Sequence, residues 1–294
     1  MSTRVAVERR LSLRHLTVAA KAWGDPSLPP LLALHGWLDN AASFDGLAPL
    51  LESHYVVAID LVGHGRSDWR NADGWYYWLD HLDDVHQVFD CLGWQSADLL
   101  GHSLGGTLAS SFAATFPDRV QRLILIEALG PLPMAQEQTV PQLRKGISAR
   151  AAWQPSQLRI FPSMERAAQT RMRANELSKG AAMTLVERGL VEVDGETGNG
   201  YRWSSDPRLL LPSLQRYSEQ QVLAILDSIV APTLLLLADP AHPYATLATM
   251  QSRIERVAKI QCQRLPGNHH LHLESPAPVA AAIKQFLALA AGVA

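Results

Sequence analysis

The sequence predicts an α/β protein with a mainly parallel central sheet. Short apolar runs alternate with helical patterns along the chain, and the runs at residues 31–34, 123–126 and 234–237 are continuously apolar. Continuous apolar runs are typical of parallel strands that helices cover on both faces. The alternation of strand and helix indicates the same architecture.

The expected strands are bounded by Pro, Gly, Asp or charged residues. They lie at residues 29–36, 54–61, 97–103, 121–129 and 231–239, with a further strand-like run at 260–265. Leu79, Leu82, Val85 and Leu92 recur at helical spacing ahead of Gly93, which predicts a helix that stops there. Residues 278–291 predict a closing helix.

The alternation breaks between residues 131 and 229. This segment is helical and rich in arginine, and then turn-rich over residues 193–207, which predicts a small hairpin or an irregular loop. We interpret residues 131–229 as an inserted cap, and residues 1–130 and 230–294 as the α/β core.

Composition narrows the class of protein. The 294 residues are 47% hydrophobic and 18% charged, with a net charge of −2, so nothing indicates nucleic acid or an anionic membrane as a partner. Cys91 and Cys262 are the only cysteines, which argues against a disulfide scaffold. The N-terminus lacks a signal-peptide pattern and no apolar run is long enough to span a membrane. We expect a cytoplasmic protein.

Ser103 is the first candidate catalytic residue. Gly101-His102-Ser103-Leu104-Gly105 fits G-x-S-x-G, a nucleophile elbow, at the junction of a strand-like and a helix-like run. A serine hydroxyl is a poor nucleophile at neutral pH, so it needs a base and a group that orients the base. A tight turn without catalysis is the structural alternative.

The base is expected in the late loop after the last strand-like run. His269, His270 and His272 follow Pro266-Gly267 there. No Cys, His or acidic cluster accompanies them at ligand spacing, so we expect no metal and no cofactor.

An oxyanion hole needs two fixed N–H donors. The Leu104 amide follows the serine at the start of a helix, which is the positive end of the helix dipole. Gly36 lets the chain turn after the strand at 29–36, so that Trp37 can present the second amide. We place His35, Gly36, His102 and His270 along the substrate pocket.

These motifs together resemble the α/β-hydrolases. "LHGWLDN", "DLVGHGRSD", "GHSLGG" and "PGNHHLHLESP" stand in the order of that superfamily, and the chain looks most similar to its serine hydrolase-like proteins. The resemblance covers residues 12–288. It implies the α/β-hydrolase fold, Ser103 as nucleophile and His269 as base, with the other late histidines as neighbours.

The acid of the triad departs from the common pattern. Many relatives carry an aspartate where this chain has Ala241, in "PTLLLLADPAHP". Two candidates remain: Glu127 after the strand that follows the elbow helix, and Asp239 two residues before Ala241. Either choice keeps the order Ser, acid, His along the chain.

A metal-independent serine hydrolase acting on a small carbonyl substrate, most favourably an ester, is the leading interpretation. The alternatives are a carbon–carbon hydrolase or perhydrolase of the same fold, and a catalytically silent binding domain. The cap residues 144–173 hold seven basic residues and one acid, which indicates either a solvated helical face or selection of an anionic substrate. The basic residues are Arg144, Lys145, Arg150, Arg159, Arg166, Arg171 and Arg173.

Overall fold

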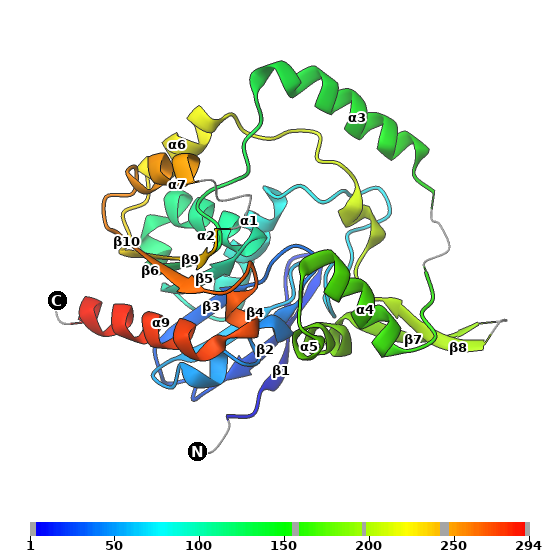
Figure 1. Cartoon of the computed structure of the whole chain (residues 1–294), viewed down its shortest axis with the longest axis horizontal. Coiled ribbons are helices and arrows are strands. Elements are labelled where there is room, and N and C mark those ends of the chain that lie inside the picture. Colours follow the sequence, from blue (N-terminus) through cyan, green and yellow to red (C-terminus); the bar gives the residue numbers. More distant parts are fainter. Residues whose placement is uncertain (1–3, 155–158, 196–197, 242–246, 292–294) are drawn as a thin grey trace.

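A central eight-stranded sheet organises the chain (Figure 1). The computed structural model describes residues 4–154, 159–195, 198–241 and 247–291. In spatial order the strands are β1 (Val7–Ser12), β2 (Thr17–Trp23), β4 (Tyr55–Ile59), β3 (Pro30–Leu34), β5 (Ala97–His102), β6 (Val120–Ile126), β9 (Thr233–Asp239) and β10 (Ile260–Pro266).

The sheet is parallel from β4 to β10, as the continuous apolar runs predicted. Only β1 and β2 are antiparallel, and both precede the first predicted strand. The apolar pattern of β1 is weak because β1 is an edge strand with five of its six residues exposed. The α/β prediction is confirmed.

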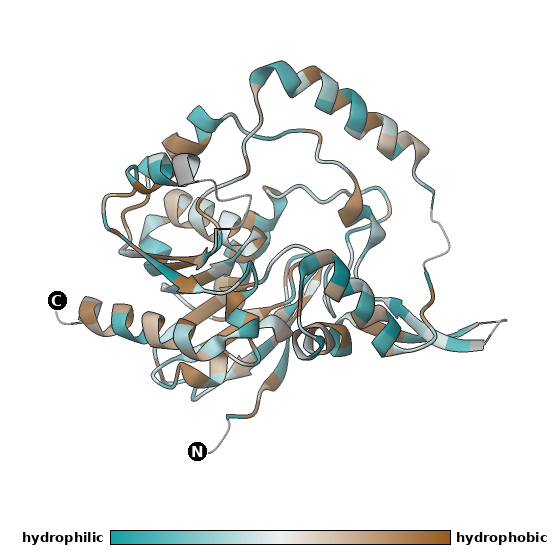
Figure 2. Ribbon diagram, in the orientation of Figure 1, coloured by the Kyte–Doolittle hydropathy of each residue, from teal (hydrophilic) through white to brown (hydrophobic). Residues whose placement is uncertain are grey.

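Helices cover both faces of the sheet. Val85 of α1 (Asp80–Cys91), Leu108 of α2 (Leu104–Thr115) and Val222 of α6 (Glu219–Asp227) belong to one hydrophobic cluster, which α7 (Leu247–Ile254) joins through Met250. Ile283 of α9 (Pro276–Ala291) lies in the cluster on the other face. Figure 2 shows the hydrophobic colour concentrated on the strands between these two layers.

Among its described residues, the segment between β6 and β9 adds three α-helices and a hairpin before α6. These are α3 (Thr139–Ala152), α4 (Met164–Asn175), α5 (Lys179–Gly189), β7 (Leu190–Gly195) and β8 (Gly198–Trp203). Of the two forms expected for the turn-rich region, the structure has the hairpin. α3 arches away from the sheet, whereas α4 and α5 lie beside it around a small core of their own (Figure 1). The division into core and cap stays a prediction.

The two cysteines of the sequence, Cys91 and Cys262, are free and exposed. Among the described residues, no helix combines the length and the apolar character that a membrane crossing requires.

Gly105 allows α2 to pack against β3. A Cβ atom at Gly105 would lie 2.0 Å from the backbone oxygen of Leu34, and one at Gly101 would lie 2.2 Å from the oxygen of Gly105 itself. Both distances are far below van der Waals contact and both involve backbone atoms, which cannot rotate away. The glycines of the elbow are therefore required by packing.

We expect Gly105→Ala to destabilise the protein by at least about 3 kcal/mol, because helix α2 must move away from β3. Chemical denaturation at neutral pH measures this loss. Gly180→Ala is the matched control: it lies in the first turn of α5 with no atom within 4 Å of the added Cβ. Equal unfolding free energies for the two variants would contradict the packing argument.

Candidate active site

Ser103 occupies a strained turn between β5 and α2. Its φ is +51°, a value that residues with a side chain rarely adopt. Two backbone hydrogen bonds hold the turn. The Ser103 amide donates to the backbone oxygen of Ile126 (3.0 Å), and the backbone carbonyl oxygen of Ser103 accepts from the Thr107 amide (3.0 Å). Such a strained residue persists only where its surroundings fix it, and strain of this kind clusters at functional sites.

His269 lies against Ser103, in the loop between β10 and α8 (Leu271–Glu274). Its Nε2 is 3.0 Å from Ser103 Oγ, and its Nδ1 is 3.2 Å from Glu127 Oε2. A carboxylate only accepts hydrogen bonds, so Nδ1 carries the proton and Nε2 is left to accept from the serine. This is the arrangement that a general base for a serine nucleophile needs.

Glu127 is held in place by the backbone of β9. Its φ is +58°, its amide donates to the Leu236 oxygen (2.9 Å), and its Oε1 accepts from the Ala238 amide (2.5 Å). The carboxylate is 1% exposed, so one oxygen is fixed and the other faces His269. The structure thus brings Ser103, His269 and Glu127 together.

Asp239, the other candidate acid, lies elsewhere. It ends β9 with its residue exposed, and within the described part of the chain no hydrogen bond or ion pair joins it to His269. Its backbone oxygen accepts from the Gly267 amide at 3.2 Å. Asp239 therefore contributes to this region through its main chain.

The two proposed oxyanion donors come from the start of α2 and from the loop after β3, which lines the same cavity as Ser103. Leu104 is the first residue of α2, and the amides in the first turn of a helix have no partner within the helix. The loop after β3 is tied to α2 because the Gly105 amide donates to the His35 oxygen at 3.0 Å. Trp37 follows in that loop, and among the described residues its amide has no hydrogen-bond acceptor.

A cavity of about 630 Å³ is lined by Ser103, His269 and Trp37. Its wall includes the predicted pocket residues Gly36, His102 and His270. From helix α4, Arg171 and Arg173 also line the cavity. Arg171 is bound to Asp39, whereas Arg173 is exposed and forms no ion pair within the described residues.

His35 lies behind this wall rather than on it, unlike the pocket position predicted for it. Its Nδ1 donates to the Gly36 oxygen (2.7 Å) and its Nε2 accepts from the Leu61 amide (2.9 Å), so both ring nitrogens serve the backbone. Burial lowers the pKa of His35, a shift that the carboxylate of Asp60 opposes. Burial also lowers the pKa of the neighbouring His64 well below its usual range, and the His35 and His81 rings add to this effect.

Neutral, buried His64 makes stability depend on pH. Unfolding returns the ring to an ordinary pKa of 6.5, so below that pH the unfolded chain binds a proton that the folded chain does not. The stability that neutral His64 contributes is fully present above pH 6.5 and is lost as the pH falls toward the lower pKa of His64 in the folded protein. We expect the unfolding free energy of the native protein to fall faster between pH 6.5 and 5 than that of His64→Leu, by up to about 1.4 kcal/mol per pH unit. Denaturant unfolding at several pH values measures it, and equal slopes would contradict it.

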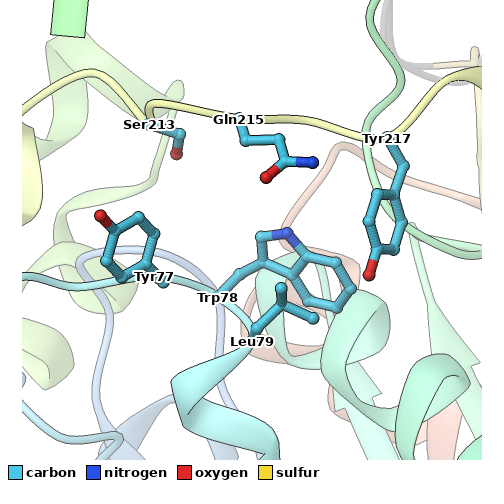
Figure 3. Close-up of a pocket in the computed structure, with 6 residues that line it drawn as sticks. All are labelled: Tyr77, Trp78, Leu79, Ser213, Gln215 and Tyr217. Carbon is cyan, nitrogen blue, oxygen red and sulfur yellow. The ribbon is translucent and has the colours of Figure 1, made fainter. Parts of the chain in front are cut away.

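A second, smaller hollow lies between the loop before α1 and the segment before α6 (Figure 3). The Trp78 and Tyr217 rings meet edge to face there, with centroids 5.3 Å apart. Its volume of about 30 Å³ is far below the 630 Å³ of the cavity beside Ser103. The cavity beside Ser103 is therefore the better candidate for a substrate site.

Asp39 is the site residue that sequence reasoning missed. It follows Trp37 and Leu38 in the loop after β3 and lines the same cavity as Ser103. Burial alone would raise the pKa of Asp39, but His270 and Arg171 beside it hold the pKa well below its usual range. An acidic residue just after the "HGW" turn was the only signal in the sequence.

Comparison with known proteins gives a consistent result. The model of the alpha/beta hydrolase fold family matches residues 29–276. The chain is 33% identical to the human serine hydrolase-like protein 2 over 302 residues, covering 95% of this chain and 93% of that protein.

Solved structures agree with the sequence matches. A hypothetical protein from Pseudomonas aeruginosa PAO1 is 37% identical with a TM-score of 0.89, over 99% of this chain and all of that one. A thioesterase domain from the curacin biosynthetic pathway is 30% identical with a TM-score of 0.82, over 95% and 99% of the two chains. The resemblance indicated by the motifs is confirmed.

Proposed function

Because the chain belongs to the alpha/beta hydrolase fold family, we propose that it is a serine hydrolase that cleaves a small carbonyl compound, most favourably an ester. The observation that carries this proposal is the line of contacts from Ser103 Oγ through the His269 ring to Glu127. The proposed reaction passes through an acyl-enzyme and uses no metal.

In the first half-reaction, Ser103 Oγ attacks the carbonyl carbon while His269 Nε2 takes the hydroxyl proton. The carboxylate of Glu127 stabilises the imidazolium, and the Trp37 and Leu104 amides bind the oxyanion. The tetrahedral intermediate expels the alcohol, which receives its proton from His269. Water then attacks the acyl-enzyme by the same steps and releases the acid.

Residues 131–229 act as the cap over this reaction in our proposal. The support is that α4 contributes Arg171 and Arg173 to the wall of the cavity that contains Ser103. A thioester is the second substrate class, favoured by the similarity to a thioesterase domain at 30% identity.

Labelling with a fluorophosphonate probe, followed by peptide mapping, tests the proposed function. We expect rapid labelling confined to Ser103, together with hydrolysis of p-nitrophenyl esters of graded chain length. A folded protein that neither labels nor hydrolyses these esters would instead be a catalytically silent binding domain. Labelling at Ser103 with very slow ester hydrolysis would favour the carbon–carbon hydrolase or perhydrolase alternative.

A further inference from the structure

Three buried side chains meet at the wall of the catalytic cavity, beside the triad. Asp39 comes from the loop after β3, His102 ends β5, and His270 immediately precedes α8. All three residues are at most 3% exposed and line the cavity. Asp39 Oδ2 is 3.3 Å from His270 Nε2 and 3.8 Å from His102 Nδ1, and the three atoms lie within 4.8 Å of one another.

Two of the facing atoms in this cluster, Asp39 Oδ2 and His102 Nδ1, lack a hydrogen bond of good geometry among the described residues, and His270 Nε2 lies 3.3 Å from Asp39 Oδ2. Both atoms are buried, and Arg171 binds the other oxygen of Asp39. His102 Nε2 donates to the backbone oxygen of His269 at 2.9 Å, which leaves a lone pair on Nδ1. Two buried acceptors that face each other are costly unless a cation or a donor lies between them.

We propose that Asp39, His102 and His270 bind one divalent transition-metal ion of the zinc class. Two histidine nitrogens and one carboxylate oxygen form a common ligand set for such ions. Ligands at about 2.05 Å in a tetrahedron are about 3.3 Å apart, which matches the distance from Asp39 Oδ2 to His270 Nε2, whereas His102 Nδ1 at 3.8 Å would have to move about 0.5 Å closer.

Parts of the surroundings fit this assignment, whereas His270 Nδ1, which would carry the proton, is buried with no hydrogen-bond partner among the described residues. The His269 carbonyl fixes the tautomer and orientation of the His102 ring, as partners of metal-bound histidines commonly do. Arg171 orients the Asp39 carboxylate from its far oxygen. Gly36 is required beside the cluster, because a Cβ there would lie 2.8 Å from His102 Nδ1.

A bound ion would suppress the proposed reaction, a consequence that rests on the proposed function. The His269 ring lies 4.9 Å from the His102 ring and 5.3 Å from the His270 ring, between centroids. An ion bound to those rings would lie on the wall of the cavity beside Ser103 and would narrow the space for the substrate carbonyl. We expect saturating Zn²⁺ to slow fluorophosphonate labelling by about tenfold or more, and a chelator to restore it.

Zinc titration of the chelator-treated full chain by calorimetry tests the site. We expect one ion per chain, with affinity at least about tenfold lower in Asp39→Asn and in His270→Ala. His269→Ala and Ser103→Ala are the matched controls and should keep both the stoichiometry and the affinity, since neither residue is a proposed ligand. Circular dichroism checks that each variant is folded.

X-ray absorption spectroscopy of the zinc-loaded native protein identifies the ligands directly, without a variant that could misfold. We expect two histidine nitrogens at about 2.0 Å in the first coordination shell. Absence of binding, binding that His269→Ala abolishes, or a shell without histidine would each overturn the proposed site. Zinc binding to a protein that never labels with fluorophosphonate would leave the site standing and refute the proposed function instead.

Discussion

Ser103→Ala is expected to lower kcat for an activated ester by about 10⁴-fold to 10⁶-fold and to abolish fluorophosphonate labelling. The variant keeps His269 and Glu127 in contact but has no oxygen to form the acyl-enzyme. Residual activity then comes only from substrate binding and the oxyanion donors. Steady-state kinetics with the p-nitrophenyl ester series, alongside thermal unfolding, separates loss of chemistry from loss of fold.

Ser111→Ala is the matched control for this experiment. Ser111 lies in the same helix, α2, and its hydroxyl donates to the Thr107 oxygen at 2.9 Å. Removal of that local hydrogen bond should leave kcat within about twofold of the native value. Full activity in Ser103→Ala would show that another residue is the nucleophile.

Glu127→Gln is expected to lower kcat by about 10³-fold to 10⁴-fold. Glutamine can still accept the Ala238 amide with its oxygen, so the side chain stays in place. Its NH₂ group then points at His269 Nδ1 and donates to it, which forces the proton onto Nε2. A protonated Nε2 cannot accept the Ser103 proton, and the neutral amide cannot stabilise an imidazolium.

Asp239→Asn is the matched control, because it makes the same change of acid to amide at the exposed end of β9. We expect its kcat within about twofold of native. Kinetics of both variants on one ester decide between the two acids. The reverse ranking would transfer the role of triad acid to Asp239.

The positions of the buried parallel strands and of the elbow were accessible from sequence because both depend on local patterns. Continuous apolar runs indicate buried parallel strands, and the glycines around Ser103 are required because a Cβ atom at Gly101 or Gly105 would lie 2.0–2.2 Å from neighbouring backbone. The short exposed strand β1 carries no such pattern, and it was not predicted.

The choice between Glu127 and Asp239 could not be made from sequence. Both residues follow buried strands that lie side by side, so the strand pattern places both near the elbow. What distinguishes them is the left-handed backbone of Glu127 and its bond to the Ala238 amide, and neither is visible before the chain is folded. The Asp39 cluster was missed for a related reason, because its three residues come from distant parts of the chain.

The position of Glu127 has a consequence for how this chain can diverge. With Glu127 at the end of β6, the proposed nucleophile and the proposed acid belong to one continuous strand–helix–strand unit, β5–α2–β6. Pro240 and Ala241, which follow β9, line the cavity that contains Ser103, so in this proposal they shape the substrate site without supplying a carboxylate. Ala241 is therefore the position where we would vary the chain to alter substrate preference.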